Sequence, residues 1–332
     1  MVNVTQASGT MGLDLSKMST VQAKMASTVI RKYYRALDAA RHFATDYDVT
    51  NSKKYPKLLV KGKLRKYDGS IKVKAGDVVL SDRELTVKVG QKELPLEPES
   101  FRNTWAADMA NITEGKIPME IAILEDFSKN SLEDIDQDIF YKGDFSNLTF
   151  AEEPAGVADG LEKKLLAETT GPNPAIVPVS VPAFDEGTGS GLNAVAGNYN
   201  TICKKVWRAL KPAVKKMPTD MFISFDNYEK FGNSYRREFG NEAKYDSTVL
   251  EQEFIYLDGT QKKCRLIPAS WLGDSNRLIC APYGAIRIGT DIKAMATSIK
   301  IMDMGYWFAY LCKVVFGVQI IDVDVISISS QS

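Results

Sequence analysis

The sequence predicts an α+β fold, and three observations lead to this prediction. The chain of 332 residues is 44% hydrophobic and 25% charged, which is typical of globular proteins and enough for about two domains of ~150 residues. Period-two alternation over residues 71–89 predicts strands, whereas residues 117–139 carry apolar side chains at helical spacing. A mixed set of short helices and strands is expected over residues 193–292.

Residues 1–56 are predicted to form an arm that contains one helix. The helix is expected between Val21 and Phe43, because apolar side chains recur there on one helical face. Its other faces are basic, with Lys24, Arg31, Lys32, Arg35 and Arg41.

Residues 57–97 are predicted to form an extended, basic, two-stranded ribbon. Ile71 and Val73 alternate with lysines, and Leu85, Val87 and Val89 alternate with Thr86 and Lys88. Residues 75–83 hold turn-forming residues and are expected to connect the two strands. The apolar face is too thin for an independent ribbon, which must therefore lie on another surface.

Ile117 and Pro118 open the clearest predicted helix. Proline is favourable at the first helical position, and Gly143 comes after the expected end. A helix of about 22 residues would be ~33 Å long. Its apolar side chains fall on one face of the helix. The remaining surface is acidic, with Glu120, Glu125, Asp126, Glu133, Asp134, Asp136 and Asp138.

Residues 144–192 are loop-rich, and a domain boundary is expected there. After this boundary, helices are predicted over 193–210 and 226–239, the second capped by Asp226. Strands are predicted at 221–225 and 278–281, together with a hairpin turning at Asp258-Gly259. The tail, residues 305–328, is predicted to form two long strands broken near Gly317.

The net charge of zero conceals a division along the chain. Residues 1–91 hold 17 basic and 8 acidic side chains, a net of +9, whereas residues 92–168 hold 7 and 18, a net of −11. Residues 169–332 hold 18 and 16, a net of +2. Opposite charges of similar size indicate mutual attraction, either within one chain or between chains.

No catalytic constellation, cofactor site or metal site is predicted, and the protein is not expected to be an enzyme. His42 is the single histidine, and no GxSxG, HExxH or GxxxxGK[ST] pattern occurs. Cys203, Cys264, Cys280 and Cys312 form no CxxC pair and are expected to be reduced and mostly buried. No secretory signal is visible, and the apolar stretch 305–321 is expected to be a buried strand.

The order of these parts resembles the major capsid proteins of tailed bacteriophages, of the Hong Kong 97 type. Three segments carry the resemblance, which covers roughly residues 50–328: residues 81–144, which begin with Ser81-Asp82-Arg83-Glu84-Leu85-Thr86-Val87, residues 278–291, and Phe316-Gly317-Val318-Gln319-Ile320. They look most like capsid proteins of phages that infect Bacteroidetes.

The resemblance implies a division into named parts. Residues 1–56 would be the N-terminal arm, 57–100 the E-loop, and 101–190 the peripheral domain with its spine helix. Residues 191–300 would be the axial domain, and 301–332 would hold strands that return to the peripheral and axial sheets.

The resemblance also implies a function and partners. The chain would assemble with copies of itself into hexamers and pentamers of an icosahedral shell around double-stranded DNA, bound without sequence specificity. Portal, scaffolding or decoration proteins would be further partners, and no membrane is involved. The protein would be located in the virion after assembly in the cytoplasm of a host bacterium.

Two alternative functions remain open. One is the shell of an encapsulin-like bacterial compartment, which has the same fold but encloses an enzyme. The other is a nucleic-acid-binding protein that uses the basic N-terminal segment, where Arg31, Lys32, Tyr33, Tyr34 and Arg35 combine charge with aromatic rings.

The charge division leads to a hypothesis about contacts between subunits. The basic ribbon is expected to lie across the acidic segment of a neighbouring copy. The basic side of this contact would include Lys61, Lys63, Arg65, Lys66, Lys72 and Lys74. The acidic side would include Glu125, Asp126, Glu133 and Asp134.

Overall fold

The structure is a computed structural model. It describes residues 30, 32, 34–35, 37–60, 66, 78–96, 119–150, 152–189, 195–239, 253–298, 300–303 and 307–330. Most of the predicted arm, the strand expected at Ile71–Lys74 and the start of the predicted helix at Ile117 lie outside these residues.

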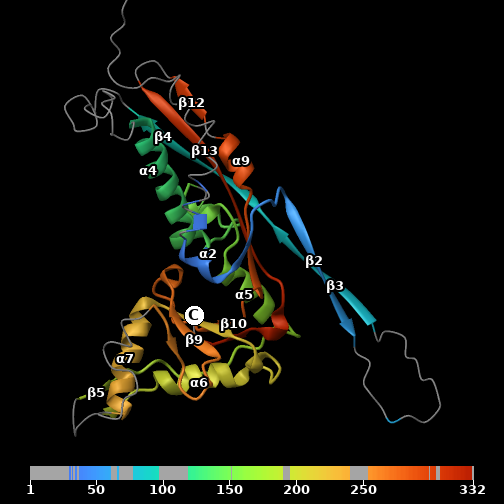
Figure 1. Cartoon of the computed structure of the whole chain (residues 1–332), viewed down its shortest axis with the longest axis vertical. Coiled ribbons are helices and arrows are strands. Elements are labelled where there is room, and N and C mark those ends of the chain that lie inside the picture. The colour runs from blue at the N-terminus through green and yellow to red at the C-terminus, as the bar shows by residue number, and fades with distance from the viewer. Residues whose placement is uncertain are drawn as a thin grey trace, which may run out of the picture.

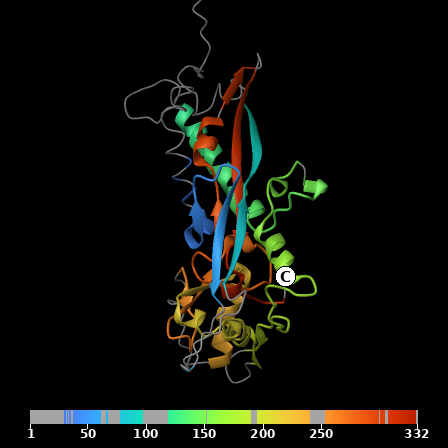
Figure 2. The same ribbon diagram turned by 90° about the vertical axis from the view of Figure 1, so that its right-hand side faces the viewer.

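One long strand organises the first sheet. This strand, β13 (Phe308–Ile320), pairs antiparallel with β4 (Lys88–Leu96), β12 (Lys300–Asp303) and β11 (Ile286–Gly289). The strand β1 (Ala44–Asp46) pairs parallel with β11 at the edge. Figures 1 and 2 show β4 and β13 running side by side along the long axis of the molecule.

The predicted break near Gly317 is wrong, because β13 continues through this residue. A Cβ on Gly317 would lie 2.2 Å from the carbonyl oxygen of Thr86, so the glycine permits close approach of two backbones. After β13 the chain forms only a short 3₁₀ helix, η9 (Val323–Val325), and the strand β14 (Ser327–Ile328).

The two-stranded ribbon exists, but its strands differ from the prediction. β2 (Ser52–Val60) pairs antiparallel with β3 (Val78–Thr86), so the predicted connection over 75–83 is wrong from Val78 onward. The strand predicted over 85–89 is divided at Val87 between β3 and β4. Both faces of most of the ribbon meet solvent, which weakens the apolar alternation that marks a strand. Figure 1 shows the β2–β3 hairpin projecting from the body.

The long helix is confirmed over the part that the structure describes. It comprises α4 (Met119–Asp134) and a π-helical turn, η2 (Ile135–Ile139), in which Phe140 N donates to Ile135 O at 2.8 Å. The ring of Phe127 packs against Tyr310, at 4.7 Å between centroids, and thereby holds α4 on β13.

Short helices cover the same region. α2 (Asp38–His42) has no side-chain cap of its own, and Asp136 of η2 accepts hydrogen bonds from the backbone amides of Asp38 and Ala39. The remaining elements here are η3 (Leu148–Phe150), η4 (Pro154–Gly156), α5 (Leu161–Thr169) and α9 (Ile292–Ser298).

A second sheet has the order β14-β10-β7-β9-β8. The predicted hairpin is confirmed as β8 (Ile255–Tyr256) with β9 (Cys264–Pro268), and the predicted strands as β7 (Thr219–Ile223) and β10 (Ile279–Ala281). Further elements are β5 (Gly187–Thr188), β6 (Val195–Ala196), α6 (Tyr199–Ala209), η6 (Val214–Lys216), α7 (Phe225–Phe239) and η8 (Ser270–Leu272).

The cap predicted for the second helix is wrong by two residues. Asp226 lies within the first turn of α7, and Ser224 precedes the helix. Ser224 Oγ accepts a hydrogen bond from Asn227 N at 3.4 Å, which is the position that an N-cap residue bonds.

Two hydrophobic cores meet at the second sheet. Phe222 of β7 points into the first core, whereas its neighbours Met221 and Ile223 point into the second, as strand alternation requires. Trp271 joins the second sheet to the helices α2 and η2 through aromatic contacts with Phe222 of β7 and with Phe43 and Phe140, which follow the two helices. All four cysteines are free and buried, as predicted. None of the described helices is long and apolar enough to cross a membrane.

Candidate assembly surfaces

The hairpin is attached to the body along its stem, defined here as residues 52–57 and 81–86. Arg83 donates from Nη1 and Nη2 to the carboxylate of Glu168 on α5, at 2.6 and 3.0 Å. The same guanidinium donates to the carbonyl oxygen of Ile320 at 3.2 Å. A bidentate pair of this kind fixes direction as well as distance, so it orients the stem against α5 and the end of β13.

A second cluster joins the stem to the chain after β13. Lys57 Nζ lies 2.7 Å from carboxylate oxygens of both Asp322 and Asp324. Lys211 also donates to Asp324 at 2.7 Å. The hydrogen bonds from Lys211 and Lys57 lower the pKa of Asp324 to about 2, so this carboxylate stays charged in mildly acidic solution.

A third cluster surrounds Asp46 at the start of the stem. Its carboxylate accepts from Lys53 Nζ at 2.7 Å and from the hydroxyl of Tyr55. Arg287 on β11 lies 3.4 Å from the same carboxylate and stacks over the ring of Tyr55. These three clusters give the stem a defined position on the body.

Beyond the stem, the hairpin presents apolar side chains to solvent. Leu58 and Leu80 are paired across the two strands and are 62% and 71% exposed. The pair forms a small apolar surface on the projecting ribbon, where another molecule can cover it.

The four predicted acidic residues lie together on α4, and each has a polar partner within the chain. Asp134 accepts from Lys92 of β4 at 2.7 Å. Glu125 pairs loosely with Lys32 and Glu133 with Lys129, at 3.8 and 3.6 Å, and Asp126 accepts from Asn130.

Of the predicted basic residues, only Lys66 is described, and it is exposed. Lys61, Lys63, Arg65, Lys72 and Lys74 lie outside the described residues. The contact predicted between the basic and acidic sets therefore stays a prediction.

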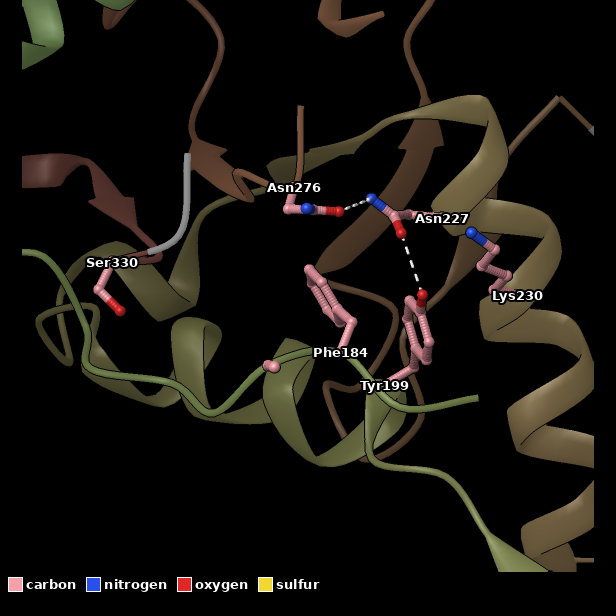
Figure 3. Close-up of a pocket in the computed structure, with 7 residues that line it drawn as sticks. Phe184, Tyr199, Asn227, Lys230, Asn276 and Ser330 are labelled. Carbon is pink, nitrogen blue, oxygen red and sulfur yellow. Dashed lines mark hydrogen bonds between the residues drawn. The ribbon is translucent and has the colours of Figure 1, made fainter. Parts of the chain in front are cut away.

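A shallow hollow of about 470 Å³ lies beside α6 and α7 (Figure 3). Phe184 stacks on Tyr199, whose hydroxyl donates to Asn227 Oδ1 at 3.0 Å, and Asn227 Nδ2 donates to Asn276 Oδ1. Lys230 on its rim pairs with Asp226. The amides and the lysine are thus engaged in structural contacts.

The single histidine has structural contacts. His42 packs edge-on against Phe222 and lies 3.6 Å from Asp38. Over the described residues, no group of three or more His, Cys, Asp or Glu side chains could hold a metal ion.

Comparison with solved structures identifies the fold. No protein-family model matches the chain, and no curated protein is similar to it in sequence. A chain in the procapsid of satellite phage P4 superposes with a TM-score of 0.58 at 10% identity, covering 91% of this chain and 89% of the other. The chain has the Hong Kong 97 capsid fold.

Two further structures with this fold are similar to the chain. The capsid of an empty GTA particle matches with a TM-score of 0.53 at 10% identity, covering 88% of this chain and 89% of that one. The capsid of Myoviridae phage XM1 matches with a TM-score of 0.52 at 12% identity, covering 87% and 89%. The α+β capsid fold predicted from the sequence is therefore confirmed.

Sequence reasoning missed the residues that hold the hairpin in this capsid fold. Arg83 and Glu168, like Lys57 and Asp322, are far apart in sequence, and each looks locally like ordinary solvated charge. The exposed Leu58 carries a detectable signal, because it is an apolar residue in a basic ribbon.

Proposed function

We propose that the protein is a major capsid protein that self-assembles into the hexamers and pentamers of an icosahedral shell enclosing double-stranded DNA. The observation that carries this proposal is the superposition on the P4 procapsid chain over nine-tenths of both chains. The projecting hairpin with its exposed Leu58 and Leu80 supports it, because this surface is unsatisfied in a single subunit.

The parts of the fold receive roles under this proposal. Residues 1–56 serve as the N-terminal arm, and 57–100 as the E-loop, which includes the end of β2 and all of β3 and β4. Residues 101–190 form the peripheral domain, with α4 as the spine helix. Residues 191–300 form the axial domain, and residues 301–332 return to the sheets of both.

The hairpin is proposed to contact a neighbouring copy. The basic residues that lie between β2 and β3 in the sequence would face the acidic surface of α4, on which Asp126 and Glu133 are exposed. Single exposed ion pairs contribute only ~0–1 kcal/mol, so many repeated pairs would determine register more than strength.

The role is structural rather than enzymatic, and the location is the virion capsid, with assembly in the host cytoplasm. Further proposed partners are a portal protein, scaffolding or decoration proteins, and the packaged DNA, which is bound without sequence specificity.

Sedimentation of the purified protein at micromolar concentration, followed by negative-stain microscopy, tests the proposal. Closed shells or capsomer rings are the expected result. A stable monomer at every concentration and salt condition contradicts it. Nucleic acid inside the shells supports a phage capsid, whereas an enclosed enzyme indicates a compartment shell instead.

A further inference from the structure

Arg277 is a buried arginine in the loop between η8 and β10. Its side chain is 8% exposed, and its Nε atom is enclosed without a hydrogen-bond acceptor. Its backbone amide donates to Ser275 Oγ at 3.2 Å, but no carboxylate among the described residues pairs with its guanidinium. A guanidinium keeps its charge in proteins and offers five N–H donors, so this arrangement is costly in an isolated subunit.

Other arginines of the chain show the usual arrangement. Arg265 donates to both carboxylate oxygens of Asp220 at 2.7 and 2.8 Å. Arg83 forms an ion pair with Glu168, and Arg287 forms one with Asp46. These side chains are more exposed than Arg277, yet each has a carboxylate partner. Among the described arginines, Arg277 is therefore the most buried, and its charge is unpaired.

The groups that surround Arg277 offset its charge only in part. Tyr141 is buried, and its hydroxyl lies 3.0 Å from Ser275 Oγ. Burial raises the pKa of Tyr141, so the phenol stays neutral and supplies no negative charge. Glu162 and Arg277 both act electrostatically on Tyr141, which places Glu162 in the vicinity, but it forms no ion pair with Arg277. The enclosed Nε donor therefore still lacks an acceptor.

We infer that Arg277 binds a carboxylate of a second copy of this chain, and that this contact forms only on assembly. The inference rests on the proposed function. Of the guanidinium nitrogens, Nε alone is both enclosed and without a partner, and the 8% of Arg277 that stays exposed is the surface that an incoming carboxylate would meet. A second copy can supply this carboxylate, because residues 92–168 of each copy hold 18 acidic against 7 basic side chains. A bidentate pair at the interface would satisfy the donors left open in the monomer.

If this contact exists, Arg277→Gln should impair assembly without reducing the stability of the isolated subunit. Removing an unpaired buried charge leaves the isolated subunit as stable as wild type, or more stable. Losing the contact raises the protein concentration at which shells first form, and we expect a rise of at least about tenfold. Arg277→Lys keeps the charge but loses the planar fork, so an intermediate threshold is expected.

Two matched variants complete the experiment. Arg265→Gln leaves Asp220 buried without its partner and should destabilise the subunit toward urea. Arg236→Gln removes an exposed arginine and should alter neither property. Subunit stability is measured by urea unfolding of unassembled protein, and assembly by light scattering against protein concentration.

Three results would overturn the inference. The first is an Arg277→Gln subunit that is destabilised like Arg265→Gln while its assembly threshold is unchanged. This result would mean that groups of the same subunit already balance the charge of Arg277. The second is a cryo-electron microscopy map of the shell in which the carboxylate on Arg277 comes from the same copy. The third is failure of wild-type protein to assemble, which removes the proposed function itself. A threshold that rises only for Arg277 variants, in a wild type that assembles, supports the inference.

Discussion

Arg83 and Glu168 form a bidentate ion pair, at 2.6 and 3.0 Å, between the hairpin stem and α5. The side chains are 27% and 23% exposed, so the pair is shielded from much of the solvent. Because Arg83 also donates to Ile320 O, one guanidinium links three separate segments of the chain. The direction in which the hairpin leaves the body is therefore determined by side chains as well as by backbone pairing.

Glu168→Gln should destabilise the subunit by about 1–3 kcal/mol, the range for charge-assisted hydrogen bonds in partly buried positions. Urea unfolding of unassembled protein measures this change. Lys54→Gln is the control, because Lys54 pairs with Asp82 at 3.7 Å on the exposed hairpin and should contribute ~0–1 kcal/mol. Equal stability of the two variants would contradict the role given to Arg83.

Replacing Leu58 and Leu80 together by lysine should leave subunit stability within about 0.5 kcal/mol of wild type, since both side chains are mostly exposed. Shell formation should nevertheless decrease strongly, because charge on this surface opposes its burial against another copy. Replacing both by methionine keeps the apolar surface and should permit assembly. Normal shells from the lysine variant would exclude this surface from the interface.

Acidification should weaken the cluster of Lys57, Lys211 and Asp324. The pKa of Asp324 is lowered to about 2 by its lysine partners, from an ordinary value of 3.8. A lowered pKa stabilises the folded state above the ordinary value, and this contribution is lost as the pH falls from about 4 to about 2.

Asp324→Asn isolates this effect from other acidic groups such as Asp144, whose pKa is also lowered to about 2, chiefly by Lys163. The stability difference between wild type and Asp324→Asn should decrease over this pH range, as measured by urea midpoints from about pH 5 to about pH 2. A constant difference would show that Asp324 does not titrate in the folded cluster.

Gly317→Ala should destabilise the subunit by about 1–3 kcal/mol or more, because the new methyl group would meet the carbonyl oxygen of Thr86. Gly289→Ala is the matched control on the adjacent strand. There, the added Cβ meets side-chain atoms of Val87 and Leu85, which can shift, so the cost should be smaller. Thermal unfolding compares the two, and the reverse order would refute the backbone clash.

Changing Lys61, Lys63, Arg65 and Lys66 to glutamate should give folded subunits that do not close shells, and wild-type assembly should weaken as salt rises. Reversal of Glu125, Asp126 and Glu133 to lysine should partly restore assembly. Asp134 is best left unchanged, because it pairs with Lys92 within the chain. Normal assembly of the first variant, observed by negative-stain microscopy, would refute the charge hypothesis.

The sequence was informative where periodicity is strong. The helix over α4, the Asp258-Gly259 hairpin and the strands β7 and β10 were predicted because their apolar side chains face the two cores. The stem residues could not be predicted, since an ion pair such as Lys57–Asp322 joins positions 265 residues apart. Gly317 misled the prediction because glycine is usual both at turns and where two backbones approach closely.

The burial of Arg277 also could not be predicted. An arginine between Asn276 and Leu278 has the local sequence of an exposed turn, and only the three-dimensional structure shows its burial. The acidic surface of α4 was predicted in outline, but the pairing of Asp134 with Lys92 depends on the register of β4 against α4, which no local pattern encodes.

The π-helical turn η2 limits how this chain can change length over evolutionary time. A π turn holds one residue more than an α turn, and each helical residue rotates the chain by ~100°. Deleting a residue such as Gln137 would restore regular α-helical bonding, but it would turn Phe140 and Tyr141 away from Trp271, which they now contact. Insertions and deletions should therefore be tolerated at the exposed loop around Gly171 and be rare between α4 and Tyr141.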